Sequence, residues 1–260
     1  HPDVDRYITP IAMAIRPSDN VVFVWNNSPT EPISDRGLST VDPTGTATRV
    51  GGSEIRAALA FDLMGNLYGI AGFGRLATVD PATGAETSLG GPILPPQLFG
   101  LDFNPSDGLL YGITNTNVLG DPVELELLKI NPINGNLLSS IPLSGTFGGS
   151  APGTLIFDVN GRLHGTVNAS TDNLFEINPL TGAVSNFRTV TSGFIPQGMG
   201  ISRGNTPTGT NVSVRPSGPT TGTSPVIITF SNVVTLGQTS LETSTSGPPP
   251  PSGFQLGDPP

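Results

Sequence analysis

The stretch of sequence that decides the fold is residues 59–89, which read LAFDLMGNLYGIAGFGRLATVDPATGAETSL. It contains three pieces that recur along the chain: residues 59–62, 67–69 and 76–84. Short runs of Leu, Val, Phe, Tyr and Thr alternate here with Gly, Asn, Asp and Pro, which is typical of short strands joined by tight turns. In the Asp-Pro-x-Thr-Gly turn, proline fixes φ at the first corner and glycine accepts the positive φ that closes it. The stretch therefore predicts three clear strands and a weaker fourth.

Each of the three pieces occurs in four copies. The other copies are residues 13–16, 101–104 and 155–158 for the first piece, residues 22–24, 110–112 and 163–165 for the second, and residues 38–45, 128–135 and 174–182 for the third. The Asp or Asn of the third piece falls at residues 42, 80, 131 and 178, at intervals of 38, 51 and 47 residues. A period of about 40 to 50 residues is typical of propeller blades.

The repeats predict an all-β chain with almost no helix. A fifth copy of the first piece alone, residues 198–202, follows the fourth unit before the pattern stops. We therefore expect residues 1–203 to form a β-propeller of four to five blades. The 34 glycines and 27 prolines among 260 residues agree with many short strands and tight turns, because both residues disfavour long helices.

Residues 204–260 have a different composition, rich in Thr, Ser, Gly and Pro. Their charged side chains are Arg215, Glu242 and Asp258. The runs at 211–214, 225–230 and 239–243 predict three strands, which is too few for a sandwich of about seven. We expect this part to be a C-terminal β-strand extension, either a partial sandwich or strands donated to another sheet. The four prolines at 248–251 then predict a polyproline II stretch.

The charge and residue usage exclude several classes of partner and chemistry. The net charge is −9 and Lys129 is the single lysine, so we expect no nucleic-acid partner. The absence of cysteine excludes disulfides, thiol catalysis and cysteine-ligated metals. No apolar run approaches the roughly 18 residues of a membrane span. Because the sequence begins His1-Pro2-Asp3 and not with methionine, we expect a processed or trimmed chain.

Over residues 8–203, the pieces Leu-x-Phe-Asp, Leu-Tyr-Gly and Leu-x-x-Val/Ile-Asp/Asn-Pro-x-Thr-Gly resemble secreted bacterial β-propeller repeat proteins of unknown function. Residues 225–258 resemble the start of a Thr/Ser/Pro-rich β module that follows such propellers in bacterial surface proteins. The resemblance implies an extracellular or cell-surface location. It transfers no catalytic residues, because the matching positions are strand and turn positions.

Two metal sites were weighed against structural roles. His164 stands where sister units have Tyr68 and Tyr111, so we interpret it as a packing residue. A copper ion bound at His1 would need His164 as its second histidine ligand. A calcium ion could be held by repeated carboxylates ringing one end of the propeller, namely Asp62, Asp80, Asp102 and Asp158. Because Asn104, Asn131 and Asn178 replace aspartate at equivalent turns, we interpret these side chains as turn caps. We predict no cofactor, with calcium as the one possibility.

Enzyme signatures are missing from the sequence. No Gly-x-Ser-x-Gly element precedes His164, and Gly72-Phe73-Gly74 lacks the third glycine of a dinucleotide loop, since Ala77 stands in its place. Trp25, the single tryptophan, is interpreted as a packing residue and not as a sugar-binding platform. We therefore expect a chain that is not an enzyme.

The complete repeats and the incomplete tail together suggest a function. Unpaired, apolar, weakly charged strands must be covered by something, and strand addition to a neighbouring copy would do so and generate a filament. We expect an extracellular structural or adhesive protein, a filament subunit that partners itself through the tail. The residues assigned to assembly are Val226, Ile227, Ile228, Phe230 and Leu241. The alternatives are a monomeric module that binds a glycan or a surface protein, and a metal-dependent propeller hydrolase.

Overall fold

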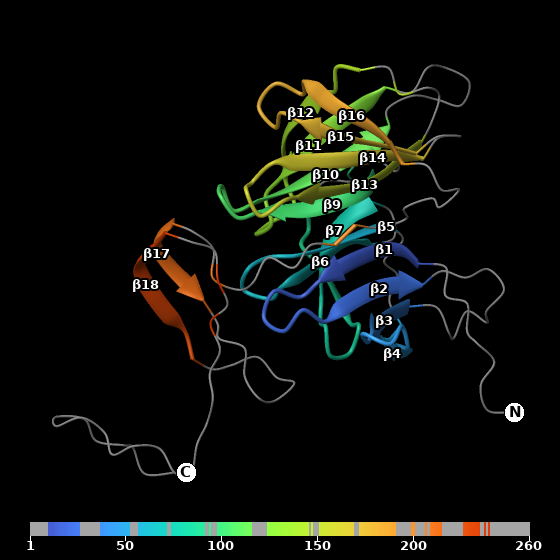
Figure 1. The fold of residues 1–260 in the computed structure, drawn as a ribbon. Helices are drawn as coiled ribbons and strands as arrows, with labels where there is room; N and C mark the ends of the chain where they lie inside the picture. The colour runs from blue at the N-terminus through green and yellow to red at the C-terminus, as the bar shows by residue number, and fades with distance from the viewer. Residues whose placement is uncertain are drawn as a thin grey trace, which may run out of the picture.

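The computed structural model describes residues 10–26, 37–52, 57–71, 74–91, 94, 98–115, 124–145, 147, 151–168, 172–190, 199–200, 206, 209–214, 226–234, 237 and 239. Within these residues the chain forms β-strands that Figure 1 labels β1 to β18. The strands of the first half are β1 (Pro10–Ile15), β2 (Val22–Asn26), β3 (Gly37–Val41), β4 (Ala47–Gly51), β5 (Ala57–Phe61), β6 (Leu67–Ala71), β7 (Arg75–Val79) and β8 (Glu86–Ser88). Those of the second half are β9 (Leu98–Asn104), β10 (Leu109–Asn115), β11 (Leu125–Ile130), β12 (Leu137–Pro142), β13 (Ala151–Phe157), β14 (Leu163–Asn168), β15 (Asp172–Ile177), β16 (Val184–Val190), β17 (Gly209–Val214) and β18 (Ile228–Val233).

Sixteen of these strands build four antiparallel sheets of four strands each, and every sheet uses strands that are consecutive in sequence. The sheets are β1–β4, β5–β8, β9–β12 and β13–β16, which we call blades 1 to 4. The first strands of successive blades are neighbours, β1 beside β5, β5 beside β9 and β9 beside β13 (Figure 1). The prediction of an all-β propeller built from four repeated units is confirmed. The weak fourth strand is clearest in blade 2, where β8 has only three residues.

The turns show why aspartate and glycine recur in the sequence. Asp62 Oδ1 accepts hydrogen bonds from two backbone N–H groups of its own turn, at 2.9 and 2.8 Å. Gly65 in the same turn has a φ of +84°, which residues with a side chain rarely adopt. Asp158 Oδ1 accepts the same two bonds in blade 4, at 2.9 and 2.8 Å. These carboxylates therefore act as caps of the turn between the first and second strands.

The core consists of apolar clusters that lie between successive blades. We call the face of a blade that points to the next blade in chain order its leading flank, and the opposite face its trailing flank. One cluster joins blades 1 and 2, with Phe23 and Phe61 in edge-to-face contact at 5.2 Å between ring centroids. A second joins blades 2 and 3. A third joins blades 3 and 4, with Tyr111 and Phe157 at 5.0 Å. Among the described residues, no such cluster joins blade 4 back to blade 1.

The remaining strands, β17 and β18, form a two-stranded antiparallel sheet. Its ladder continues at a bridge in which Thr206 and Gly237 exchange backbone hydrogen bonds of 3.0 and 2.9 Å. Figure 1 shows this hairpin, in orange, standing beside the blades and not within them. The two strands predicted at 211–214 and 225–230 are thus present with shifted bounds. The third, at 239–243, lies outside the described residues except for Thr239, which is not in a strand.

Candidate functional site

One position in the second strand of each blade faces the leading flank. It holds Phe23 in β2, Tyr68 in β6, Tyr111 in β10 and His164 in β14, and we call it the ring slot. The structure thus places His164 in the tyrosine position that the repeat alignment assigned to it. Phe23, Tyr68 and Tyr111 are buried by the following blade, whereas the side chain of His164 keeps 17% of its surface exposed.

Where the residue in the ring slot is tyrosine or histidine, its polar group contacts a carboxylate in the turn before its own strand. The pairs are Tyr68 with Asp62 at 3.3 Å, Tyr111 with Asp107 at 2.6 Å, and His164 Nε2 with Asp158 Oδ2 at 3.2 Å. Burial raises the pKa of both tyrosines, and the neighbouring carboxylates add to the rise. Both phenols are therefore protonated at neutral pH and act as donors. In blade 1 the slot has no polar tip, and the guanidinium of Arg16 lies 5.1 Å from the centroid of the Phe23 ring.

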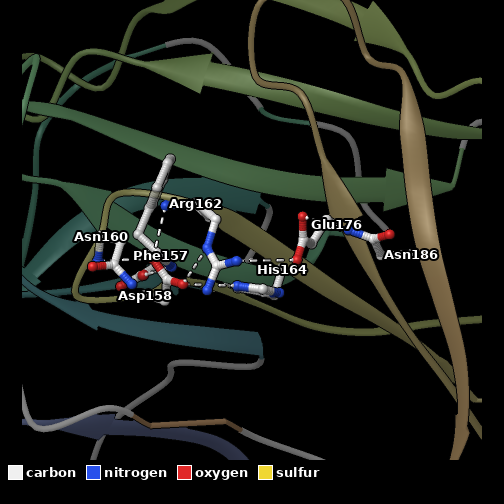
Figure 2. A network of polar contacts seen from close by, with 8 residues as sticks. Phe157, Asp158, Asn160, Arg162, His164, Glu176 and Asn186 are labelled. Carbon is white, nitrogen blue, oxygen red and sulfur yellow. Dashed lines mark hydrogen bonds and ion pairs between the residues drawn. The ribbon is translucent and has the colours of Figure 1, made fainter.

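In blade 4 the ring slot belongs to a network that crosses the sheet from its first to its fourth strand (Figure 2). Arg162 Nε donates to Asp158 Oδ2 at 2.8 Å, and its Nη1 lies 3.6 Å from Glu176 Oε1. Asn186 in β16 donates through Nδ2 to Glu176 Oε2 at 2.9 Å. We call Asp158, Arg162, His164, Glu176 and Asn186 the blade 4 ladder.

The charge at the inner end of the ladder is fixed by hydrogen bonds. Partial burial alone would raise the pKa of Asp158, but the bonds from the Arg162 backbone, His164 and the Arg162 side chain outweigh it and hold that pKa at about 2. Asp158 is therefore ionised at neutral pH. Its negative charge orients both the imidazole and the guanidinium along the flank.

One further position on the leading flank of blade 4 is polar, whereas the same position on the leading flanks of blades 1 to 3 is apolar. Trp25, Ile70 and Ile113 occupy the position two residues after the ring slot in blades 1 to 3, and each is buried in an interface cluster. In blade 4 that position holds Thr166, which accepts a hydrogen bond from the backbone N–H of Thr154 at 3.0 Å. The leading flank of blade 4 is therefore suited to strands richer in polar side chains than those packed against blades 1 to 3.

The four carboxylates considered for calcium do not share one environment. Asp62, Asp80 and Asp158 cap turns with both oxygens engaged, whereas Asp102 lies within β9, buried, and accepts the N–H of Phe157 at 2.6 Å. The interpretation as a turn cap is therefore wrong for Asp102, because it sits within the strand, two residues before the turn position. Within the described ranges, no group of three or more His, Asp or Glu side chains lies close enough to hold a metal ion. The cofactor prediction itself stays a prediction.

Trp25 is buried in the cluster between blades 1 and 2 and is 4% exposed, which agrees with the packing role expected for it. Its indole Nε1 is the buried side-chain polar atom that has no hydrogen-bond partner in the described part of the chain. A ring buried in this way is not a surface platform for a sugar.

The residues assigned to assembly lie in and beside the hairpin. Val226 and Ile227, just before β18, are 38% and 51% exposed. Ile228 and Phe230 are half-buried within β18, and Leu241 lies outside the described residues. Among the residues described, no helix is long and apolar enough to cross a membrane.

Sequence reasoning identified His164 but missed the rest of the blade 4 ladder. The available signal was the glutamate at the third-strand position opposite His164. At the strand position of Glu176, units 1 to 3 carry Thr40, Thr78 and Lys129, so unit 4 is the one with a carboxylate there. Comparing the units position by position would have found it.

No protein-family model matches the sequence, and no curated protein matches it. Several solved structures share the fold. The hydrazine synthase of Kuenenia stuttgartiensis is 16% identical over 72% of this chain and 51% of its own, with a TM-score of 0.48. A GH43 glycoside hydrolase, engineered to have both endo-xylanase and exo-arabinofuranosidase activity, is 12% identical over 72% and 43%, with a TM-score of 0.50. The glutaminyl cyclase of Myxococcus xanthus is 18% identical over 69% and 70%, with a TM-score of 0.49. The chain spans about half the length of the first two.

The likeness to the GH43 glycoside hydrolase concerns the fold alone, and it corrects one expectation. We expected a chain that is not an enzyme, on the ground that catalytic motifs are missing. That expectation is overturned, because structures with this fold include a glycoside hydrolase and the fold is therefore consistent with an enzyme. At these identities no catalytic residue transfers to this chain.

Proposed function

We propose that this chain is an extracellular structural or adhesive surface protein that assembles with copies of itself through the β-strands of its C-terminal tail. The observation that carries the proposal is the β17–β18 hairpin. It is a two-stranded sheet, and in the described residues neither strand pairs with a strand of the blades. A sheet of two strands is marginally stable alone, so it gains stability by pairing or packing elsewhere.

The side chains of the hairpin region agree with this role. Val226, Ile227 and Val234 are 38%, 51% and 83% exposed, and they flank a strand whose Ile228 and Phe230 are only half-buried. Exposed apolar residues beside unpaired strand edges favour addition to another sheet. Each copy would carry a donor hairpin and an acceptor at different places, so the contact is heterologous and propagates into a filament unless its rotation closes a ring.

Deletion of residues 204–260 tests the proposal. The full chain at micromolar concentration should form ordered filaments in negative-stain electron microscopy and scatter light as a species far above the mass of one chain. The truncated chain should remain a folded monomer that keeps the strand signal of its four blades by circular dichroism. Filaments that form equally well without the tail would contradict the proposal, and so would a full chain that stays monomeric.

A second function is favoured by one further observation. Ile133 and Leu180, at matching positions in the turns of blades 3 and 4, are 83% and 77% exposed. Large apolar side chains presented on turns are suited to docking a protein surface. If the full chain is a monomer, we favour a module that binds a surface protein, and replacing both residues by serine should then weaken that binding.

A further inference from the structure

Among the described residues, no apolar cluster forms an interface between blades 4 and 1, and the turn glycines agree with this independently. A Cβ on Gly84 of blade 2 would lie 3.2 Å from Gly51 at the end of blade 1, and one on Gly182 of blade 4 would lie 2.2 Å from the Pro142 carbonyl oxygen of blade 3. Gly135 of blade 3 packs against Gly91 in the same way. The equivalent Gly45 of blade 1 meets nothing within 4 Å in the described part of the chain.

The centre of the ring shows what belongs in the missing interface. The described residues of the fifth repeat copy, Met199 and Gly200, lie between the first strands of blades 4 and 1. The Met199 N–H donates to Thr154 Oγ1 of β13 at 3.3 Å. A Cβ on Gly200 would lie 2.7 Å from Ile15 Cγ1 of β1. Together with β1, β5, β9 and β13, these two residues line the central pocket. Met199 and Gly200 thus occupy the place of the first strand of a fifth blade.

Two flanks border the place of Met199 and Gly200, the leading flank of blade 4 and the trailing flank of blade 1. We call the region between these two flanks the opening. The leading flank of blade 4 carries the blade 4 ladder and Thr166. The trailing flank of blade 1 carries Ile15, Val22 and Val41, all only half-buried, although residues at such positions in blades 2 to 4 are buried in the interface clusters. A β-hairpin that packs between these two flanks therefore needs one face with polar groups and one apolar face.

We propose that the opening between blades 4 and 1 is an acceptor site for the β17–β18 hairpin of a second copy of this chain. The hairpin has the required composition, since Ser213 and Thr229 hydrogen-bond each other at 2.9 Å on one face and Val212 and Phe230 pair on the other. In this chain the β17–β18 hairpin stands beside the blades and not between blades 4 and 1 (Figure 1). Exchange between copies fills every opening with an identical element, as in domain swapping.

This inference rests on the proposed self-assembly and adds the location of the acceptor. The absence of cysteine from these 260 residues makes the test direct. Two single variants, Glu176→Cys on the acceptor flank and Phe230→Cys on the hairpin, are mixed and oxidised under mild conditions. Thr78→Cys is the matched control acceptor, because Thr78 holds the position of Glu176 in blade 2, whose leading flank is already covered by blade 3. Ser185→Cys, opposite Glu176 and exposed, is the second acceptor variant in case loss of the carboxylate disturbs blade 4.

The expected result is a cross-linked dimer from Glu176→Cys or Ser185→Cys mixed with Phe230→Cys, at least ten times more abundant than from Thr78→Cys with Phe230→Cys. A chain carrying both Glu176→Cys and Phe230→Cys should give a ladder of multimers on a non-reducing gel. A compact cross-linked monomer from that chain would mean that the hairpin fills its own opening, which overturns the inference. Filaments of the natural chain without any cross-link would overturn the acceptor site alone, whereas absence of filaments and cross-links would overturn the proposed function as well.

Discussion

At the scale of single residues, the ring slot shows how a repeat can keep one contact while changing its chemistry. Tyrosine and histidine both direct a polar tip at a turn carboxylate, to Asp62, Asp107 or Asp158. The tyrosines are neutral donors between blades. His164 shares Asp158 with Arg162, much as Tyr111 shares Asp107 with Lys129, but its flank is not followed by another blade among the described residues.

Asp158 should make the stability of blade 4 depend on pH in the acid range. Its pKa in the folded chain is about 2, below the ordinary value of about 3.9 for an unfolded aspartate. Its contribution is therefore complete above about pH 4 and is lost as the pH falls towards 2. In urea unfolding, Asp158→Asn should lower the midpoint at neutral pH, and the difference from the natural chain should shrink as the pH approaches 2. A difference that stays constant over this range would contradict the assignment.

At the scale of strands and turns, close backbone contact between blades limits the allowed residues. A Cβ on Gly51 would lie 1.9 Å from the Thr83 carbonyl oxygen in the turn of blade 2, whereas the nearest atom for Gly52 is the flexible end of Arg49 at 3.4 Å. Gly51→Ala should therefore lower the free energy of unfolding by about 1 to 3 kcal/mol, because blades 1 and 2 must separate.

Gly52→Ala is the matched control, with an expected change within about 0.5 kcal/mol. Urea denaturation of both variants, followed by tryptophan fluorescence, measures the two effects, since Trp25 is buried in the same interface. Equal stability of the two variants would mean that the blades yield locally at this contact.

The strands and turns also show how much of the structure could be predicted from the sequence. The repeat spacing predicted a propeller of four to five blades, and the hydrophobic alternation and the Asp-Pro-x-Thr-Gly turn predicted the strands of each blade, because these are local signals. The ring slot was predicted for the same reason. The blade 4 ladder was not, since its contacts between Arg162, Glu176 and Asn186 depend on the pairing of β14, β15 and β16. Nor could the sequence say whether the fifth copy of the repeat builds a blade, because its partners come from the far end of the ring.

At the scale of the whole molecule, the tail supplies strands with almost no charge, so the assembly should depend on apolar packing and backbone pairing. Phe230→Asp should abolish filaments, because it places a carboxylate in a contact that has to exclude water. Ser231→Asp, on the opposite and exposed face of β18, is the control and should leave them intact. Light scattering in about 1 M salt should still show assembly by the natural chain, since salt at this level screens charge but not apolar burial. Disassembly in salt would contradict this account.

The proposed acceptor site between blades 4 and 1 also bears on how such a filament could grow. If the proposed acceptor site between blades 4 and 1 is correct, each copy offers one acceptor and one hairpin, so a filament ends in an empty acceptor at one tip and an unused hairpin at the other. The two tips are chemically different, and the filament has a direction. A separate peptide carrying residues 206–239 would fill the opening at one tip and stop elongation there while leaving the other tip free. Growth could then be regulated from one end by a short soluble segment.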